Sequence, residues 1–162
     1  MSDDFNLPMR QGPGPRTTDR LPHSQLTQHG PDDIIEKLHH WCFALPGVLN
    51  EASGISVPGA RALVLKDSIP GNPEAFMTGR EFAHIHPPPD TGSMHVKIPS
   101  DMASEVVKSG WGEEHYLVSQ GHLPAGLVLL YSPRDDEELK IIQLVVTQAY
   151  EFAVGQLSDR SF

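Results

Sequence analysis

Positive charge and cysteine are both scarce in this chain of 162 residues. Only 12 Lys and Arg residues face 21 Asp and Glu residues, which leaves a formal net charge of −9 with histidine neutral. Because such a field repels phosphate groups, the composition argues against nucleic acid and anionic membrane as partners. Cys42 is the only cysteine, so an intramolecular disulfide is excluded and a reducing compartment is favoured.

Long apolar runs and several well-known catalytic motifs are also missing. No apolar run approaches the roughly 20 residues that span a bilayer, and the acidic, Pro/Gly-rich N-terminus does not resemble a secretory signal. We therefore predict a cytoplasmic protein. The sequence has no Gly-x-Ser-x-Gly elbow and no phosphate-binding loop. Gly110-x-Gly112 precedes no predicted helix, so it is not a dinucleotide fingerprint, and neither a flavin nor a nicotinamide site is evident.

The first 30 residues differ in character from the rest of the chain. They hold four prolines and show no helical or strand periodicity, so they cannot offset their ordering entropy from their own contacts. We predict that residues 1–30 form either a disordered tail or an extended arm that wraps the domain through His23, Leu26 and His29. Residues 31–157 are predicted to form a single domain, followed by a short tail at 158–162.

Hydrophobic periodicity within the domain alternates between strand-like and helix-like. Helical patterns cover residues 32–45, 101–109 and 135–153, and they begin or end at Pro31, Gly110 and Gly155. Strand patterns cover residues 61–66, 82–86, 93–98 and 127–131, and the last of these is apolar enough to be a central, doubly buried strand. This order predicts an α+β fold in which helices pack on an antiparallel sheet.

Three histidines are concentrated in the predicted hairpin formed by residues 82–86 and 93–98. Strand alternation predicts that Phe82, His84 and His86 share one face, and that His95 faces the same way from the partner strand. If the Pro-rich loop closes symmetrically, His84 lies directly opposite His95. Directly opposed residues have Cβ atoms about 4.5–5.5 Å apart, so these two imidazoles would touch.

Such a histidine group has more than one chemical use. His84, His86 and His95 can hold a divalent metal such as Fe, Zn or Cu, or they can share a proton. They can also form a satisfied polar face without any ligand. The glutamate that a cupin places shortly after His-x-His is absent, because Pro87-Pro88-Pro89-Asp90 takes its place. The sequence therefore favours a histidine site and leaves the metal open.

A second polar cluster follows the helix at 101–109. The segment Gly110-Trp111-Gly112-Glu113-Glu114-His115 is predicted to lie in a turn. His115 can supply another imidazole, either Glu113 or Glu114 a carboxylate, and Trp111 an aromatic wall over a small ligand.

Charged and phenolic groups elsewhere complete the candidate site. Tyr131 ends the predicted central strand and is a candidate for substrate binding. Arg134 follows it and can hold a carboxylate, phenolate or enolate, or it can pair with Glu137 or Glu138 on the last helix. Arg80 and Glu81, which lead into the histidine hairpin, are interpreted as a structural ion pair.

Three segments of the sequence resemble the luciferase-domain family, which is named for fungal luciferases and includes many short bacterial proteins. The resemblance runs from about Gly14 to Gly155. Its most specific parts are the block from His84-x-His86-Pro87 to His95, the element Gly110-Trp111-Gly112-x-x-His115, and Tyr131-x-Pro133-Arg134.

The resemblance implies an oxidoreductase of the oxygenase or monooxygenase type, of the kind found in secondary metabolism. Fungal members oxidise a hydroxylated pyrone with O₂ and form a high-energy intermediate that loses CO₂. By analogy, this chain would bind a small enol, phenol or pyrone-like metabolite and use His84, His86, His95, His115 and Arg134 as catalytic residues, with Trp111, Tyr131 and Glu114 binding the substrate.

Two other functions stay open at this point. The same histidines can serve an isomerase, cyclase or decarboxylase that uses only acid–base chemistry, or a ligand- or metal-binding module without turnover. The expected partners are a small-molecule substrate and O₂, and the arm at residues 1–30 also allows a homo-oligomer.

Overall fold

The computed structural model describes residues 5–123 and 125–156. Within these ranges, six strands form one antiparallel sheet in the spatial order β1-β2-β3-β4-β6-β5. The strands are β1 (Val48–Ala52), β2 (Arg61–Leu65), β3 (Glu81–Ile85), β4 (Met94–Lys97), β5 (Gly112–Glu114) and β6 (Leu127–Leu130). The predicted α+β class is confirmed, while the predicted tail at 158–162 lies outside the described residues.

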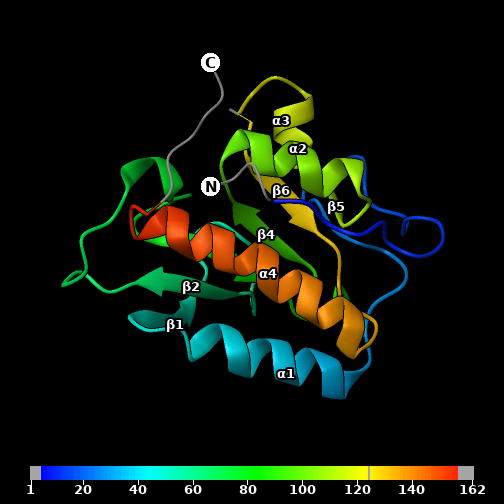
Figure 1. The fold of residues 1–162 in the computed structure, drawn as a ribbon, viewed down its shortest axis with the longest axis horizontal. Helices are drawn as coiled ribbons and strands as arrows, with labels where there is room; N and C mark the ends of the chain where they lie inside the picture. Colours follow the sequence, from blue (N-terminus) through cyan, green and yellow to red (C-terminus); the bar gives the residue numbers. More distant parts are fainter. Residues whose placement is uncertain (1–4, 124, 157–162) are drawn as a thin grey trace.

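One face of this sheet is covered by α1 (Asp32–Phe43), α2 (Ser100–Lys108) and α4 (Asp136–Ala153), as Figure 1 shows. The described residues also form α3 (Tyr116–Ser119) and a short 3₁₀ helix, η2 (Pro73–Ala75). The Asp135 side chain accepts the N–H of Glu138 at 2.8 Å and caps α4, as its spacing predicts. Among the described residues, no helix has both the length and the apolar character to cross a membrane.

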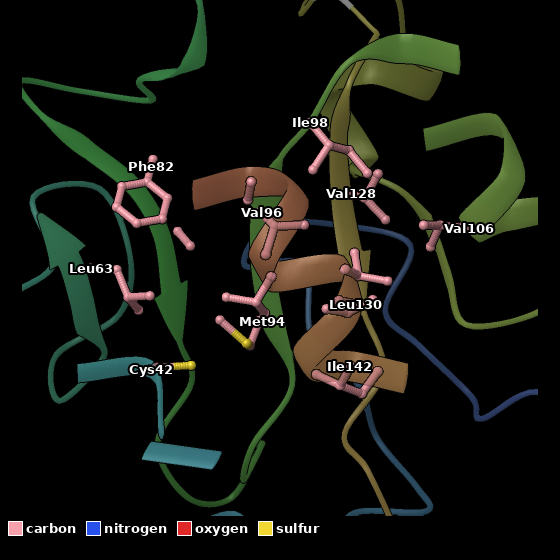
Figure 2. Close-up of a cluster of buried hydrophobic side chains, with 14 of the residues drawn as sticks. Cys42, Leu63, Phe82, Met94, Val96, Ile98, Val106, Val128, Leu130 and Ile142 are labelled. Carbon is pink, nitrogen blue, oxygen red and sulfur yellow. The ribbon is translucent and has the colours of Figure 1, made fainter. Parts of the chain in front are cut away.

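The hydrophobic core lies between the sheet and these helices. Figure 2 shows Met94, Val96 and Leu130 of the sheet and Ile142 of α4 in one cluster, and all four are almost fully buried. Cys42 of α1 belongs to the same core, where burial raises the pKa of its thiol far above the ordinary value. A buried thiol with a raised pKa is inert as a nucleophile, so Cys42 is a packing residue.

The segment after α2 differs from its prediction. The sequence predicts a turn at residues 110–115, but Gly112–Glu114 forms strand β5, which pairs with β6 at the edge of the sheet. A Cβ atom at Gly112 would lie 2.5 Å from the carbonyl oxygen of Leu129, so only glycine permits this close approach. Three residues are too few to show strand periodicity. As a result, β6 is one strand from the edge.

The segment before α1 lies against the domain. The Arg10 N–H donates to the carbonyl of Ser109 at 3.0 Å, and Thr17 and Gln25 form an antiparallel bridge within the segment. The Gly30 N–H donates to Ser132 Oγ at 2.9 Å at the point where the segment enters α1. We call residues 5–30 the arm. The division of the chain at residue 30 stays a prediction.

Candidate functional site

The histidine face of the sheet lies opposite the helices. His84 of β3 pairs directly with His95 of β4, which confirms the predicted register. Their ring centroids lie 5.2 Å apart, and His84 Nε2 lies 3.1 Å from His95 Nδ1. His86 completes the group, with its ring centroid 5.1 Å from that of His84 and 4.8 Å from that of His95. All three side chains are buried.

A β-bulge in β3 changes which residues share this face. The pairing of β2 with β3 shifts register between Leu63 and Val64, so that Phe82 is the extra residue. Phe82 therefore joins Ala83 in the hydrophobic core, where its ring lies 6.3 Å from that of Tyr150. The prediction that Phe82 shares a face with His84 is wrong, because a bulge interrupts strict alternation.

The same bulge brings Glu81 to the histidine face. Glu81 Oε2 accepts hydrogen bonds from His84 Nδ1 at 2.8 Å and Ser53 Oγ at 2.7 Å, and Oε1 accepts from the Gly54 N–H at 2.9 Å. Burial opposes ionisation of this carboxyl, but the three donors outweigh it and lower the pKa of Glu81. The predicted Arg80–Glu81 pair is wrong, because Arg80 instead donates to backbone carbonyls at the end of β2 and in the loop that follows it.

His86 is oriented by a second carboxylate. Its Nδ1 lies 2.8 Å from Ser93 Oγ, and Ser93 donates its own proton to Asp90 at 2.8 Å. Because the Ser93 hydroxyl has only one proton, its oxygen must accept from His86 Nδ1–H. Asp90 also accepts the backbone N–H of Gln25 at 3.1 Å, so it ties the hairpin loop to the arm.

These contacts define a chain of proton positions from Glu81 to His95. Since ionised Glu81 only accepts, His84 carries its proton on Nδ1 and presents a lone pair at Nε2. His95 then donates from Nδ1 to His84 and is left with a lone pair at Nε2. His95 Nε2 is buried and has no hydrogen-bond partner among the described residues. Burial, followed by the neighbouring histidines, lowers the pKa of His95 well below its ordinary value, so it is neutral at physiological pH.

His23 from the arm reaches the same face. Its Nε2 lies 2.8 Å from Glu113 Oε2, and its Nδ1 accepts the N–H of Tyr116 at 3.1 Å. Both ring nitrogens are therefore engaged, and His23 has no free lone pair for a metal. Although His23, His95 and His115 have ring nitrogens close together, this group does not fit a metal ion.

His115 begins α3 rather than lying free in a turn. Its Nδ1 accepts the N–H of Leu117 at 3.0 Å, which caps the helix. Its ring centroid lies 4.6 Å from that of His95. Burial, and then repulsion from His23, His84 and His86, lowers the pKa of His115 to about 4.

A cavity of about 820 Å³ opens over the histidines. His84, His86, His95 and His115 all line it, together with residues from the arm, the loop at 55–58 and the proline-rich loop at 87–90. Its apolar side chains include Leu21, Leu26 and Ile55, each more than half exposed. The cavity therefore combines a polar histidine floor with a largely apolar mouth, which is typical of small-molecule sites.

Four predicted site residues do not line this cavity. Trp111 is buried and its Nε1–H donates to the carbonyl of Pro8 at 2.7 Å. The Tyr131 hydroxyl donates to Glu113 at 2.8 Å, while Glu114 lies exposed on β5. Arg134 forms the predicted ion pair with Glu138 at 2.6 Å and also donates to the arm at the carbonyl of Gln11. In the structure, these four side chains lie at the arm, at the edge strand β5 or at the start of α4, and not in the cavity.

Sequence reasoning also missed residues that the structure brings to the site. Glu81 and Asp90 orient the histidines, and Arg20 reaches the cavity from the arm. His23 also lines the cavity, whereas the sequence predicts it only as a contact between the arm and the domain. Arg20 is the only Lys or Arg among the described residues that line the cavity. The His-x-x-Pro-Asp pattern of the loop is a weak signal for Asp90, whereas the arm residues carry no local signal.

His84, His86 and His95 pass a test of fit for a divalent metal. Their ring nitrogens lie within 4.8 Å of one another. His84 and His86 each direct Nδ1 toward a carboxylate system, which is the outer arrangement that metal-bound histidines commonly have. Two ligand nitrogens on one tetrahedral ion lie about 3.3 Å apart, close to the observed 3.1 Å between His84 Nε2 and His95 Nδ1. A metal held by these two atoms would take the place of the proton on His95 Nδ1.

The lowered histidine pKa values predict acid sensitivity of the metal-free protein. In the unfolded chain these histidines have pKa values near 6.5, so between pH 6.5 and about 4 the unfolded state binds more protons than the native state. The free energy of unfolding must therefore fall as the pH falls through this window. For His115 we expect a loss on the order of 1 kcal/mol, measured by urea unfolding in EDTA.

A matched pair of variants separates His115 from other titrating groups. The His115→Asn variant keeps an acceptor for the α3 cap but cannot titrate, so its stability should vary less between pH 6.5 and 4. His122→Asn, at an exposed position outside the cavity, should retain the wild-type pH profile. An unchanged profile in His115→Asn would contradict the prediction.

Taken together, the fold and site define a single α+β domain with a histidine-lined cavity on the face of its sheet that α1, α2 and α4 do not cover (Figure 1). The family model described as the Luciferase domain matches residues 79–149, which include the whole histidine hairpin and β6. The predicted resemblance to this family is confirmed.

Curated relatives extend the similarity over most of the chain. The luciferases of Armillaria gallica and Neonothopanus nambi are each 27% identical to it, over 172 and 176 residues, and that of Armillaria mellea is 28% identical over 173 residues. Each alignment covers 95% of this chain and 62% of the relative, so the chain spans less than two thirds of their length. No solved structure matches the chain.

Proposed function

We propose that this protein is a small oxidative enzyme that deprotonates an enol, phenol or pyrone-like metabolite and lets the anion react with O₂. The observation that carries the proposal is the unpartnered, buried lone pair of His95 Nε2 in a residue that lines the 820 Å³ cavity. Similarity to proteins named luciferase supports an oxygenase-type reaction.

The chain's own residues can account for the proton in this reaction. His95 Nε2 takes the proton of the substrate hydroxyl. The lowered pKa of His95 keeps this nitrogen unprotonated near pH 7 but makes it a weak base, so the transfer depends on stabilisation of the cation that forms. The positive charge that forms is delocalised toward ionised Glu81 through His84. Arg20, the cation lining the cavity, faces the substrate anion and replaces the predicted role of Arg134 there.

The oxidation step is balanced by O₂ alone. An electron pair of the enolate or phenolate carbon forms a C–O bond with O₂, which is reduced to a peroxide while that carbon is oxidised. The proton held on His95 returns to the terminal oxygen, so substrate plus O₂ becomes a hydroperoxide with no other reductant. The apolar mouth at Leu21, Leu26 and Ile55 suits an apolar extension of the substrate.

A divalent metal on His84, His86 and His95 belongs to the same proposal. When bound, Fe, Zn or Cu would supply Lewis-acid polarisation of the substrate oxygen, and Fe or Cu would also supply redox activation of O₂.

O₂ uptake with a series of hydroxylated pyrones and phenols tests the proposed function. We expect turnover in air, none under strict anaerobiosis, and hydroperoxide or its decay products in equal amounts to the O₂ consumed. Turnover that continues unchanged without O₂ would overturn the oxidation and favour proton-transfer chemistry by an isomerase, cyclase or decarboxylase. Absence of turnover with tight ligand binding would favour a binding module.

Metal analysis of the same preparation decides between the metal-assisted and the cofactor-free form. Stoichiometric metal that is lost in His84→Ala and His95→Ala, but retained in His40→Ala at an exposed position of α1, would place it at the histidine hairpin. Full turnover after treatment with EDTA would instead assign the reaction to the histidines alone.

A further inference from the structure

We infer that Glu81 is a positioning residue that determines which ring nitrogen of His95 carries the proton. It acts through two successive hydrogen bonds, between Glu81 and His84 and between His84 and His95. This inference deepens the proposed function and, for its catalytic consequence, rests on it. Glu81 touches neither the cavity nor a substrate, since it is buried behind His84 and does not line the cavity. Its effect must therefore pass along the hydrogen bonds to His84 and His95.

The loop at Ser53 and Gly54 makes Glu81 an obligatory hydrogen-bond acceptor. Ser53 Oγ already accepts the N–H groups of Ile55 and Ser56, at 3.2 and 3.1 Å, so its own proton is directed to Glu81. The Gly54 N–H is a backbone donor and cannot reverse its direction. With two donors already facing it from this loop, Glu81 has only acceptor capacity for the third neighbour, His84 Nδ1.

In a neutral imidazole, one ring nitrogen donates a hydrogen bond and the other accepts one. If His84 must carry its proton on Nδ1, its Nε2 can only accept, and His95 must donate to it from Nδ1. His95 Nε2 is then the bare nitrogen that the cavity needs as a base. A proton on His84 Nε2 would reverse both bonds and place a proton on His95 Nε2, which would leave no base there.

Loss of the carboxylate should therefore reverse the direction of the hydrogen bonds from Glu81 through His84 to His95, while the side chains stay in place. In Glu81→Gln alone, the amide oxygen can still face His84 and Ser53, at the cost of a repulsive contact between the amide NH₂ and the Gly54 N–H. In the double variant Ser53→Ala/Glu81→Gln, that orientation loses the Ser53 bond. The amide oxygen then accepts from Gly54, and the NH₂ donates one of its two protons to His84 Nδ1 with no backbone N–H directed at it.

The experiment compares this double variant with Ser53→Ala, which keeps the carboxylate. Nitrogen-15 NMR of metal-free protein in EDTA, without substrate, identifies which ring nitrogen of each histidine carries the proton. We expect Ser53→Ala to retain protons on Nδ1 of His84 and His95, and the double variant to show both on Nε2. O₂ uptake should fall about 10²–10⁴-fold only in the double variant.

A second control and a rescue keep the inference open to refutation. Glu113→Gln, which removes a partly buried carboxylate paired with a histidine of the same face, should leave the ring protons of His84 and His95 unchanged. Glu81→Ala should carry the protons of His84 and His95 on Nε2. Added formate, but not neutral formamide, should return both protons to Nδ1. His84 protonated on Nδ1 in both the double variant and Glu81→Ala would overturn the inference.

Failure of the inference and failure of the proposed function give different results. If the double variant carries both ring protons on Nε2 but the wild type consumes no O₂, the positioning role of Glu81 is supported and only the proposed oxidation is removed. If the wild type consumes O₂ but the double variant keeps both ring protons on Nδ1, the positioning role of Glu81 is removed and the proposed oxidation is retained.

Discussion

The His95→Asn variant is expected to consume O₂ about a thousandfold more slowly than the wild type. Asparagine can still place an amide nitrogen near the position of Nδ1 and donate to His84 Nε2, but it supplies no atom in place of Nε2. Loss of a positioned general base typically lowers the rate 10²–10⁴-fold. The measurement is the initial rate of O₂ uptake at saturating substrate, with folding checked by thermal unfolding.

His40→Asn is the matched control for this substitution. His40 lies exposed on α1, outside the cavity, so the same chemical change there should leave the rate within twofold of the wild type. A folded His95→Asn protein that retains wild-type turnover would remove His95 from the mechanism, and the base would have to be sought at His86 or His115.

The Gly30→Ala variant is expected to lose about 3 kcal/mol of unfolding free energy. A Cβ atom at Gly30 would lie 1.8 Å from the carbonyl oxygen of Pro133, which is backbone and cannot turn aside as a flexible side chain can. The added methyl must push the arm away from the strand-to-helix connection at Ser132 and Pro133 and break the bond from the Gly30 N–H to Ser132 Oγ. Urea unfolding measures the loss.

Gly14→Ala provides the control for the backbone effect alone. No atom lies within 4 Å of a Cβ built at Gly14, so alanine should be neutral or slightly stabilising there. Displacement of the arm in Gly30→Ala should also weaken substrate binding, because Leu21 and His23 line the cavity. Equal stability of the two variants would show that the arm contact near Pro133 contributes little.

Much of the site could be predicted because the hairpin obeys simple strand rules. The sequence predicts the pairing of His84 with His95 from alternation and loop symmetry, and the structure confirms it. The helices that cover the sheet and the cap at Asp135 also follow from local patterns. These features depend on residues close together in the chain, where spacing alone determines geometry.

The remaining features depend on contacts that no local pattern carries. A single extra residue at Phe82 brings Glu81 to the histidine face, and alternation cannot reveal which residue of a strand will bulge. His23 reaches the site from a segment without periodicity, and its partner Glu113 follows it by 90 positions. Arg134 and Trp111 belong to the motifs that carry the family resemblance, yet they hold the arm through Gln11 and Pro8.

The bulge at Phe82 links the packing of the hydrophobic core to the hydrogen bonds of the histidine face. Phe82 packs against Tyr150 on the helical side, and this packing holds the adjacent Glu81 on the histidine side. A substitution that repacks the interior near α4 can therefore alter the position of a proton on the opposite side of the sheet. Among relatives, changes in this part of the interior would be constrained by chemistry as well as by stability, and divergence of function could begin there without any change in the cavity itself.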